Sequence, residues 1–256
     1  DFNAFALVIP YICNSYAQQL NMRHIIIAST SALHGSGYLD YLLKDLELFF
    51  IDAEDILFIP YARPGGISHD DYTEKARLAF SKINKTVKGI HTFKNPLEAI
   101  KNAQGIFVGG GNTFVLTNQL YKNNLVGALQ TSVNNGTPYL GTSAGSNICG
   151  LTIKTTNDMP IVYPPSFNAL GFVPFNINPH YLNPDTNSKH MGETRETRIK
   201  EFHNFNTQPV VGLREGSWLL VKNKSITLKG TLTARIFEYN KPPYEIKPNT
   251  ELNTLN

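Results

Sequence analysis

The sequence predicts a single α/β domain in which a mostly parallel sheet carries helices on both faces and antiparallel strands at its C-terminal edge. The length of 256 residues suits one large domain of this class. A hydrophobic fraction of 41% and a mean hydropathy of -0.20 are typical of a folded protein with a sizeable core. From residue 22 onward, short apolar runs alternate with helical patterns. Such alternation favours parallel strands that are joined by right-handed helical crossovers.

The alternation starts with an Ile-rich run at 24–28, which predicts a buried strand. The next segment, 38–50, repeats its apolar residues with the period of a helix. Asp70 and Asp71 are cap candidates for the following helix, and Pro96 suits the first position of a short one. The remaining elements of this half continue the pattern, with strands at 56–59, 105–108 and 138–140 and helices at 72–83, 95–103, 113–121 and 125–133.

The C-terminal third differs, because its strands are short and are separated by Gly or Asn turns. These strands are expected to extend the sheet or to add an antiparallel edge, and they cover 209–213, 218–221, 225–228 and 235–239. We expect 22–240 to form the single domain and 241–256 to be a C-terminal tail. Residues 1–21 hold a short apolar stretch and are expected to be an N-terminal extension or a processed leader.

Composition excludes several classes of function. Lys and Arg number 23 against 20 Asp and Glu, a net charge of +3 with no basic stripe, so nucleic acid is not an expected partner. No apolar run reaches the roughly 18 residues of a membrane-spanning helix, so no membrane function is expected. The two cysteines, Cys13 and Cys149, are too few for a disulfide framework and lack metal-ligand spacing. We therefore expect no metal site and a reducing, cytoplasmic location.

The motif GTSAG at 141–145 is the clearest indication of a catalytic residue in the sequence. It matches the pattern G-x-S-x-G, in which a serine sits on a sharp turn between a strand and a helix. Small flanking residues allow the neighbouring backbone to pack closely, and the amides at the helix start favour developing negative charge. Ser143 is therefore the candidate nucleophile, although a glycine-rich turn with an incidental serine has the same pattern.

A nucleophilic serine needs a base and an acid that orients the base. Downstream of Ser143, Asp158 and then His180 give the chain order Ser, Asp, His, which is one that such triads adopt. Spacing alone does not assign these roles. Other candidates remain open, namely His190 and His203 for the base, and Asp185, Glu193 and Glu215 for the acid.

A second glycine cluster, at 109–111, lies where a strand is expected to meet a helix. Exposed amides in such a turn can bind an anion, including the oxyanion of a tetrahedral intermediate. The cluster lacks the Gly-Lys-Ser/Thr of a phosphate-binding loop and the glycine spacing of a dinucleotide site. A tight turn is the alternative interpretation.

Together these segments resemble the peptidase E family of serine peptidases, the aspartyl dipeptidases, whose fold is similar to that of class I glutamine amidotransferases. The resemblance extends from about residue 22 to about residue 239. It rests on the motifs GGGNTF at 109–114, GTSAG at 141–145, TTNDMP at 155–160, NPHY at 178–181 and GETRETRI at 192–199.

The resemblance implies a serine exopeptidase that hydrolyses dipeptides with an N-terminal aspartate through an acyl-enzyme. It implies Ser143 as nucleophile, His180 as base and Asp158 as the acid that orients the base. By the same resemblance, Gly111 and Ala144 supply the amides of the oxyanion hole. No cofactor is implied, the partner is a small peptide substrate, and the chain is expected to be a monomer or a homodimer.

The resemblance also implies that Arg195 binds the side-chain carboxylate of the substrate's aspartate. The segment 192–198 predicts the start of a helix, and Arg195 and Arg198 are three residues apart and so share a face. The alternative is that both arginines are solvated and paired with Glu196 or Glu201. Such exposed pairs are typically worth less than about 1 kcal/mol.

Two positions depart from the family pattern. Thr142 stands where an aromatic residue is expected, and Ser146 where alanine is usual. In having a threonine at this position, the chain also resembles the related cyanophycinases, which release dipeptides from a polyaspartate-arginine polymer. The alternatives are therefore a cyanophycinase-like exopeptidase and a catalytically silent ligand-binding homologue, while TTNDMP and NPHY favour the dipeptidase branch. A glutamine amidotransferase is disfavoured, because its nucleophile is a cysteine and Ser143 fills that position.

Overall fold

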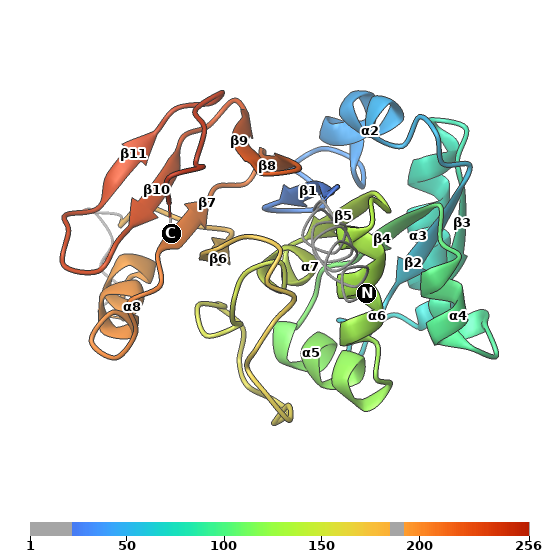
Figure 1. The fold of residues 1–256 in the computed structure, drawn as a ribbon, viewed down its shortest axis with the longest axis horizontal. Coiled ribbons are helices and arrows are strands. Elements are labelled where there is room, and N and C mark those ends of the chain that lie inside the picture. The colour runs from blue at the N-terminus through green and yellow to red at the C-terminus, as the bar shows by residue number, and fades with distance from the viewer. Residues whose placement is uncertain (1–21, 185–191, 256) are drawn as a thin grey trace, which may run out of the picture.

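The computed structural model describes residues 22–184 and 192–255 and contains two sheets that lie side by side (Figure 1). The larger, seven-stranded sheet consists of β1 (His24–Ala28), β2 (Asp55–Ile59), β3 (Thr86–Gly89), β4 (Gly105–Val108), β5 (Tyr139–Thr142), β8 (Ser217–Lys222) and β9 (Ser225–Gly230). Its order is β3-β2-β4-β5-β1-β8-β9. The first five strands in this order are parallel, and β8 and β9 continue the sheet antiparallel.

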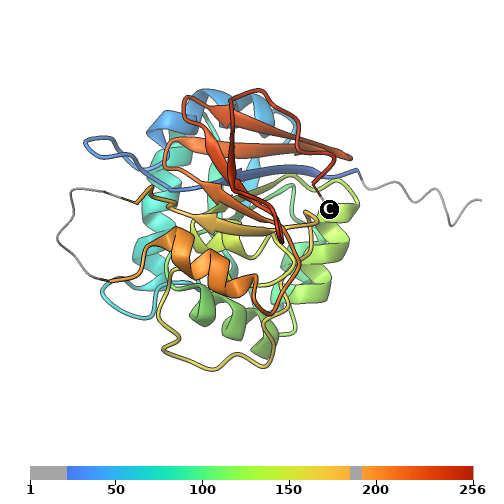
Figure 2. The ribbon, with the colours of Figure 1, turned by 90° about the vertical axis from the view of Figure 1, so that its left-hand side faces the viewer.

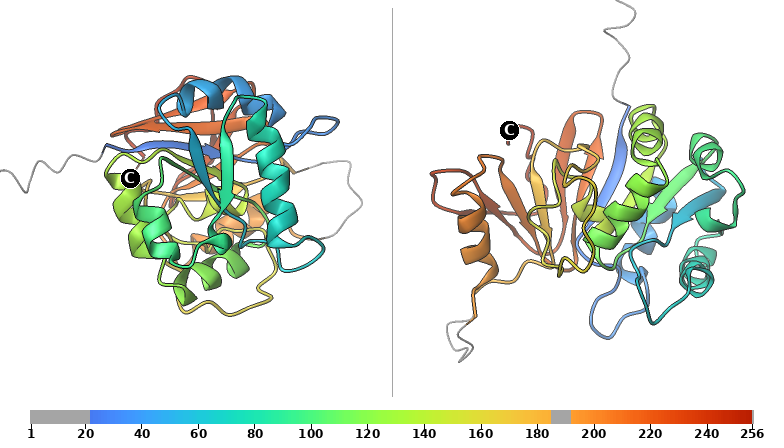
Figure 3. Two further views of the ribbon diagram at one scale, coloured as in Figure 1. Left: turned by 90° about the vertical axis from the view of Figure 1, so that its right-hand side faces the viewer. Right: turned by 90° about the horizontal axis from the view of Figure 1, so that it is seen from below.

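Helices cover both faces of this sheet (Figure 3). α2 (Leu43–Phe49) and α3 (His69–Ser81) pack on one face, and α4 (Pro96–Lys101), α5 (Thr113–Lys122), α6 (Val126–Asn134) and α7 (Ala144–Asn147) pack on the other. Successive side chains of β1 alternate between the two layers. Ile25 and Ile27 join the cluster with α5 and α6, whereas Ile26 joins the cluster with α2 and α3. The α/β fold class with a mostly parallel sheet is confirmed.

The smaller, four-stranded sheet consists of β6 (Asn176–Pro179), β7 (Val210–Leu213), β10 (Ala234–Phe237) and β11 (Tyr244–Ile246), in the order β11-β10-β7-β6. β6 and β7 are parallel, and the other pairs are antiparallel. α8 (Arg195–Phe202) packs on this sheet through Ile199, which clusters with Tyr181, Val210 and Phe237 (Figure 2). Other residues of β6 and β7 share the core of the larger sheet, so the two sheets form one continuous body.

Two local expectations need correction. The N-cap of α3 is Ser68, whose hydroxyl accepts the amide of Asp71 at 3.0 Å, so Asp70 and Asp71 lie inside the first helical turn rather than at its cap. The helix expected at 38–50 begins as a single 3₁₀ turn, η1 (Asp40–Leu42), before α2. By contrast, Asn95 caps α4 and Pro96 stands at its start, as expected.

Three strands were not expected from the sequence: β3, β6 and β11. β11 lies inside the segment 241–256 that was expected to be a tail, and it pairs with β10. Leu252 and Leu255 of the same segment are buried in the main core, so the folded domain extends beyond residue 240. The predicted leader at 1–21 lies outside the described residues. Within 22–184 and 192–255, no helix has the length and apolar character needed to span a membrane.

Candidate active site

Ser143 occupies the sharp turn between β5 and α7. Its backbone has φ 54° and ψ −110°, a conformation that costs a residue with a side chain of the order of 1–3 kcal/mol. The flanking glycines make the turn possible, because a Cβ on Gly141 would stand 2.4 Å from the carbonyl oxygen of Gly145, and one on Gly145 would stand 2.2 Å from that of Val108. The strand and the helix that the motif requires are therefore both present around Ser143.

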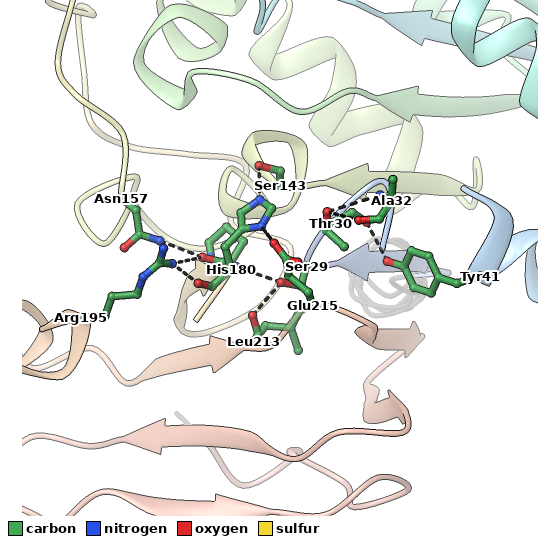
Figure 4. A network of polar contacts seen from close by, with 11 residues as sticks. Ser29, Thr30, Ala32, Tyr41, Ser143, Asn157, His180, Arg195, Leu213 and Glu215 are labelled. Carbon is green, nitrogen blue, oxygen red and sulfur yellow. Dashed lines mark hydrogen bonds and ion pairs between the residues drawn. The ribbon is translucent and has the colours of Figure 1, made fainter. Parts of the chain in front are cut away.

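His180 lies directly after β6 and reaches Ser143 from the other sheet. The distance between His180 Nε2 and Ser143 Oγ is 2.8 Å (Figure 4). The His180 backbone is left-handed, with φ 55°, and its amide donates to the hydroxyl of Ser29 at 2.9 Å. Of the other candidate bases, His203 contacts the carbonyl oxygen of Gln208 instead, and His190 lies outside the described residues.

The acid beside His180 is Glu215, not Asp158. Glu215 Oε1 lies 2.6 Å from His180 Nδ1 (Figure 4). The expectation for Asp158 is corrected, since its Oδ2 accepts the Thr113 amide at 2.7 Å and the Thr156 hydroxyl at 3.0 Å. Glu215 was one of the acids that spacing left open. It reaches His180 because β7 runs parallel to β6, so that the residues following the two strands become neighbours.

Ser29, which follows β1, links the strands that carry these groups. Its hydroxyl donates to the Leu213 carbonyl at 2.7 Å while accepting the His180 amide (Figure 4). The side chain is fully buried. Leu213 ends β7 two residues before Glu215, so one hydroxyl fixes the ends of both strands against the larger sheet. Sequence analysis missed Ser29, because a serine after a strand has no distinguishing local pattern.

The glycine cluster after β4 lies against Ser143. A Cβ on Gly110 would be 2.9 Å from Ser143 Cβ, and one on Gly111, whose φ is 142°, would be 2.3 Å from the carbonyl oxygen of Ala62. Tyr72 holds the loop by donating its hydroxyl to the Gly110 carbonyl at 3.0 Å. The loop therefore comes close to Ser143 only because both positions lack side chains.

Arg195 is the first residue of α8, and it approaches the strand that carries His180. Its Nη1 donates to the carbonyls of Pro179 and His180, and Asn157 Nδ2 donates to the same Pro179 carbonyl at 2.8 Å (Figure 4). No carboxylate of the described residues forms an ion pair with Arg195. Burial is the main cause that lowers the pKa of Arg195 from its ordinary value, and the positive charge of Arg198 lowers it further. The guanidinium stays charged at neutral pH and retains donors for an anion.

Burial raises the pKa of the Cys149 thiol, which keeps it protonated and unreactive. Among residues 22–184 and 192–255, no group of three His, Cys, Asp or Glu side chains is arranged to hold a metal ion.

Comparison with known proteins identifies similar sequences over almost the whole chain. The model of peptidase family S51 matches residues 25–229. The chain is 44% identical to Peptidase E of Streptomyces coelicolor over 232 residues, which covers 91% of this chain and 94% of that one. It is also 44% identical to a probable alpha-aspartyl dipeptidase of Drosophila melanogaster over 236 residues, covering 91% and 97%.

Two solved structures have the same fold. A peptidase from an acI-B1 Actinobacterium aligns with a TM-score of 0.66 at 16% identity, covering 93% of this chain and 99% of that one. A putative peptidase E protein from Listeria monocytogenes aligns with a TM-score of 0.60 at 21% identity, covering 82% and 100%. These two similarities support the arrangement of the strands and helices.

Proposed function

Because the chain belongs to peptidase family S51, we propose that it is a serine-type dipeptidase that hydrolyses dipeptides with an N-terminal aspartate. The relatives' names support this substrate class. The observation that carries the chemistry is the chain of contacts from Ser143 through His180 to Glu215, at 2.8 Å and 2.6 Å. A catalytically silent homologue would have no need to keep these three groups in line.

The proposed reaction begins when Ser143 Oγ attacks the main-chain carbonyl carbon of the substrate's N-terminal aspartate. His180 Nε2 takes the hydroxyl proton, and Glu215 orients the ring through Nδ1 and stabilises the charge that forms on it. His180 then gives the proton to the leaving amine, and a water molecule, activated by the same histidine, hydrolyses the acyl-enzyme. Glu215 thus takes the role that the family resemblance suggested for Asp158.

We assign the oxyanion hole to the amides of Gly111 and Ala144. Ala144 begins α7 directly after the nucleophile, and the Gly109–Gly111 loop packs against Ser143. Removing one donor of such a hole typically costs about 3 kcal/mol of transition-state stabilisation. Tyr72 supports this loop through the Gly110 carbonyl, which keeps its amides in position.

We assign recognition of the aspartate side chain to Arg195. Its guanidinium is partly buried and forms no ion pair with a carboxylate of the described residues, so its donors are available to an incoming carboxylate. Arginine offers a planar fork of donors that matches a carboxylate better than an ammonium group does. The neighbouring Arg198 instead pairs with Glu193 at 3.7 Å.

We also propose that the protein acts in the cytoplasm on small peptides rather than on nucleic acid, as a monomer or a homodimer. The low cysteine content and the buried, protonated Cys149 support a reducing compartment. Cell fractionation and size-exclusion chromatography with light scattering would test the location and the assembly state.

Hydrolysis of a small panel of peptides tests the proposed function. We expect the purified protein to cleave Asp-Leu, to cleave Glu-Leu and Ala-Leu much more slowly, and to leave acetyl-Asp-Leu intact. Release of leucine is measured by chromatography, and the Ser143→Ala variant is the control for contaminating peptidases. Equal cleavage of Ala-Leu and Asp-Leu would contradict the assignment of an aspartyl dipeptidase. Cleavage of a polyaspartate-arginine polymer in preference to Asp-Leu would favour the cyanophycinase-like alternative.

A further inference from the structure

Asp158 belongs to a segment that contacts both the start of α5 and the end of β6. On one side, its Oδ2 accepts the amide of Thr113, which begins α5 two residues after Gly111. On the other side, Asn157 donates to the Pro179 carbonyl, immediately before His180. The carbonyl of the next residue, Met159, accepts a hydrogen bond from Asn112 at 2.9 Å. The segment 156–159 therefore connects the Gly109–Gly111 loop, here called the oxyanion loop, with the end of β6, which precedes His180.

One oxygen of the Asp158 carboxylate is uncommitted. Both of its hydrogen bonds to described residues, from Thr113 and Thr156, go to Oδ2. No Lys, Arg or His within 22–184 and 192–255 forms an ion pair with Asp158, and its side chain is only partly buried. Glu215, not Asp158, is the carboxylate that contacts His180. The Asp158 carboxylate is thus held by two donors and has one oxygen left that can bind a cation.

The proposed substrate carries such a cation close to the scissile bond. The ammonium nitrogen of an N-terminal residue is two bonds from the carbonyl carbon, so the two atoms lie about 2.5 Å apart. When that carbon is held beside Ser143 and the oxyanion loop, the ammonium group must lie near the same loop. Asn157 and Arg195 both donate to the Pro179 carbonyl (Figure 4). Asp158 directly follows Asn157, so the segments that carry one negative and one positive side chain meet at the end of the strand before His180. An N-terminal aspartate presents the complementary pair.

We propose that the carboxylate of Asp158 binds the ammonium group of the substrate's first residue and so makes the enzyme require a free N-terminus. This inference rests on the proposed dipeptidase function. A charge-assisted hydrogen bond of this kind, once desolvated, contributes roughly 10- to 100-fold to kcat/KM. Asp158 and Arg195 then recognise the two charges of the aspartate independently, one by its amine and the other by its side chain.

The test compares Asp-Leu with succinyl-leucine, which has a hydrogen in place of the ammonium group and keeps both carboxylates. We expect the wild type to prefer Asp-Leu by roughly 10- to 100-fold in kcat/KM. Asp158→Asn should remove most of this preference by slowing Asp-Leu alone, since the asparagine oxygen can still accept the Thr113 amide. Glu98→Gln is the matched control, because it neutralises an exposed carboxylate in the first turn of α4 and should leave the preference unchanged.

The outcomes separate this inference from the function on which it rests. If Asp158→Asn slows both substrates equally, Asp158 acts through the oxyanion loop or the base, and the ammonium site is overturned. Equal cleavage of both substrates by the wild type overturns it as well, and this comparison needs no variant that must fold. Failure of the wild type to cleave Asp-Leu at all would instead refute the proposed dipeptidase function itself, and the ammonium site with it.

Discussion

The two sheets contribute different halves of the site. The seven-stranded sheet supplies Ser143 after β5 and the glycine loop after β4. The four-stranded sheet supplies His180 after β6 and Glu215 after β7, and α8, which packs on it, supplies Arg195. Neither half contains both a serine nucleophile and its base. Catalysis therefore depends on how the two sheets are held against each other, and the Ser29 side chain contacts the ends of β6 and β7 at His180 and Leu213.

The largest expected effect on activity comes from Ser143, in the part of the site that the seven-stranded sheet supplies. Ser143→Ala should lower kcat for Asp-Leu by about 10⁴-fold or more, since loss of a nucleophile leaves only binding and oxyanion stabilisation. The melting temperature should change little, because the hydroxyl contributes one hydrogen bond, to His180, and the glycine turn remains. Activity assays and a thermal scan of the same preparation check both parts. Turnover within ten-fold of the wild type would show that another group is the nucleophile.

A substitution of Glu215 tests the part of the site that the four-stranded sheet supplies. Glu215→Gln should lower kcat by about 10³-fold for Asp-Leu and for succinyl-leucine alike, because an amide no longer fixes the histidine tautomer or stabilises its charge. Asp158→Asn is the comparison variant, and we expect it to act on Asp-Leu alone. If instead Asp158→Asn shows the large loss on both substrates and Glu215→Gln is mild, the role of the acid belongs to Asp158, as the family resemblance suggested.

The same division explains how much could be predicted from the sequence. In the larger sheet, Ile-rich strands and helices with a regular apolar period are local signals, and they identified β1, β2, β4 and β5. Ser143 and the glycine loop were found because their motifs record a backbone geometry that only small residues allow. These features depend on residues that are close in the chain.

In the second sheet, β7 and β10 were expected from the sequence, but β6 and β11 were not. β6 has the sequence NINP, in which two asparagines and a proline disfavour a strand. It forms because Asn178 Nδ2 donates to the Thr155 carbonyl and Asn147 Nδ2 donates to the Ile177 carbonyl, contacts that span 23 and 30 residues. Without β6, its pairing with β7 could not be foreseen, and Glu215 could not be placed beside His180.

Arg195 should give the next largest effect. Arg195→Ala should lower kcat/KM for Asp-Leu by about 100-fold and remove most of the preference for Asp-Leu over Asn-Leu, because the partly buried cation proposed to bind the carboxylate is lost. Some loss on both substrates is also expected, since Arg195 donates to the His180 carbonyl. Arg198→Ala is the control, because its exposed pair with Glu193 is worth little. A preserved preference in Arg195→Ala would place side-chain recognition elsewhere.

The smallest effect concerns the contact between the two sheets. Ser29→Ala removes the acceptor of the partly buried His180 amide, while the Leu213 carbonyl keeps the Tyr181 amide as its donor, so the expected cost is about 1–3 kcal/mol. Because His180 is held in a left-handed backbone conformation, we expect part of this cost to appear as misplacement of its ring. Steady-state kinetics should then show kcat for Asp-Leu falling about ten-fold with KM nearly unchanged.

A general loss of fold stability in Ser29→Ala must be distinguished from a displacement of the His180 ring. Ser217→Ala is the matched control, since it removes another fully buried serine hydroxyl, which donates to the Leu232 carbonyl at 3.0 Å and makes no contact with His180. The sharper measurement is the double variant with Glu215→Gln. If Ser29 acts through His180, its removal should cost much less once Glu215 no longer holds the ring, because the two changes disturb the same histidine. If the two losses multiply, Ser29 supports the fold and not the base, and the orientation of His180 is set by Glu215 and the strand pairing alone.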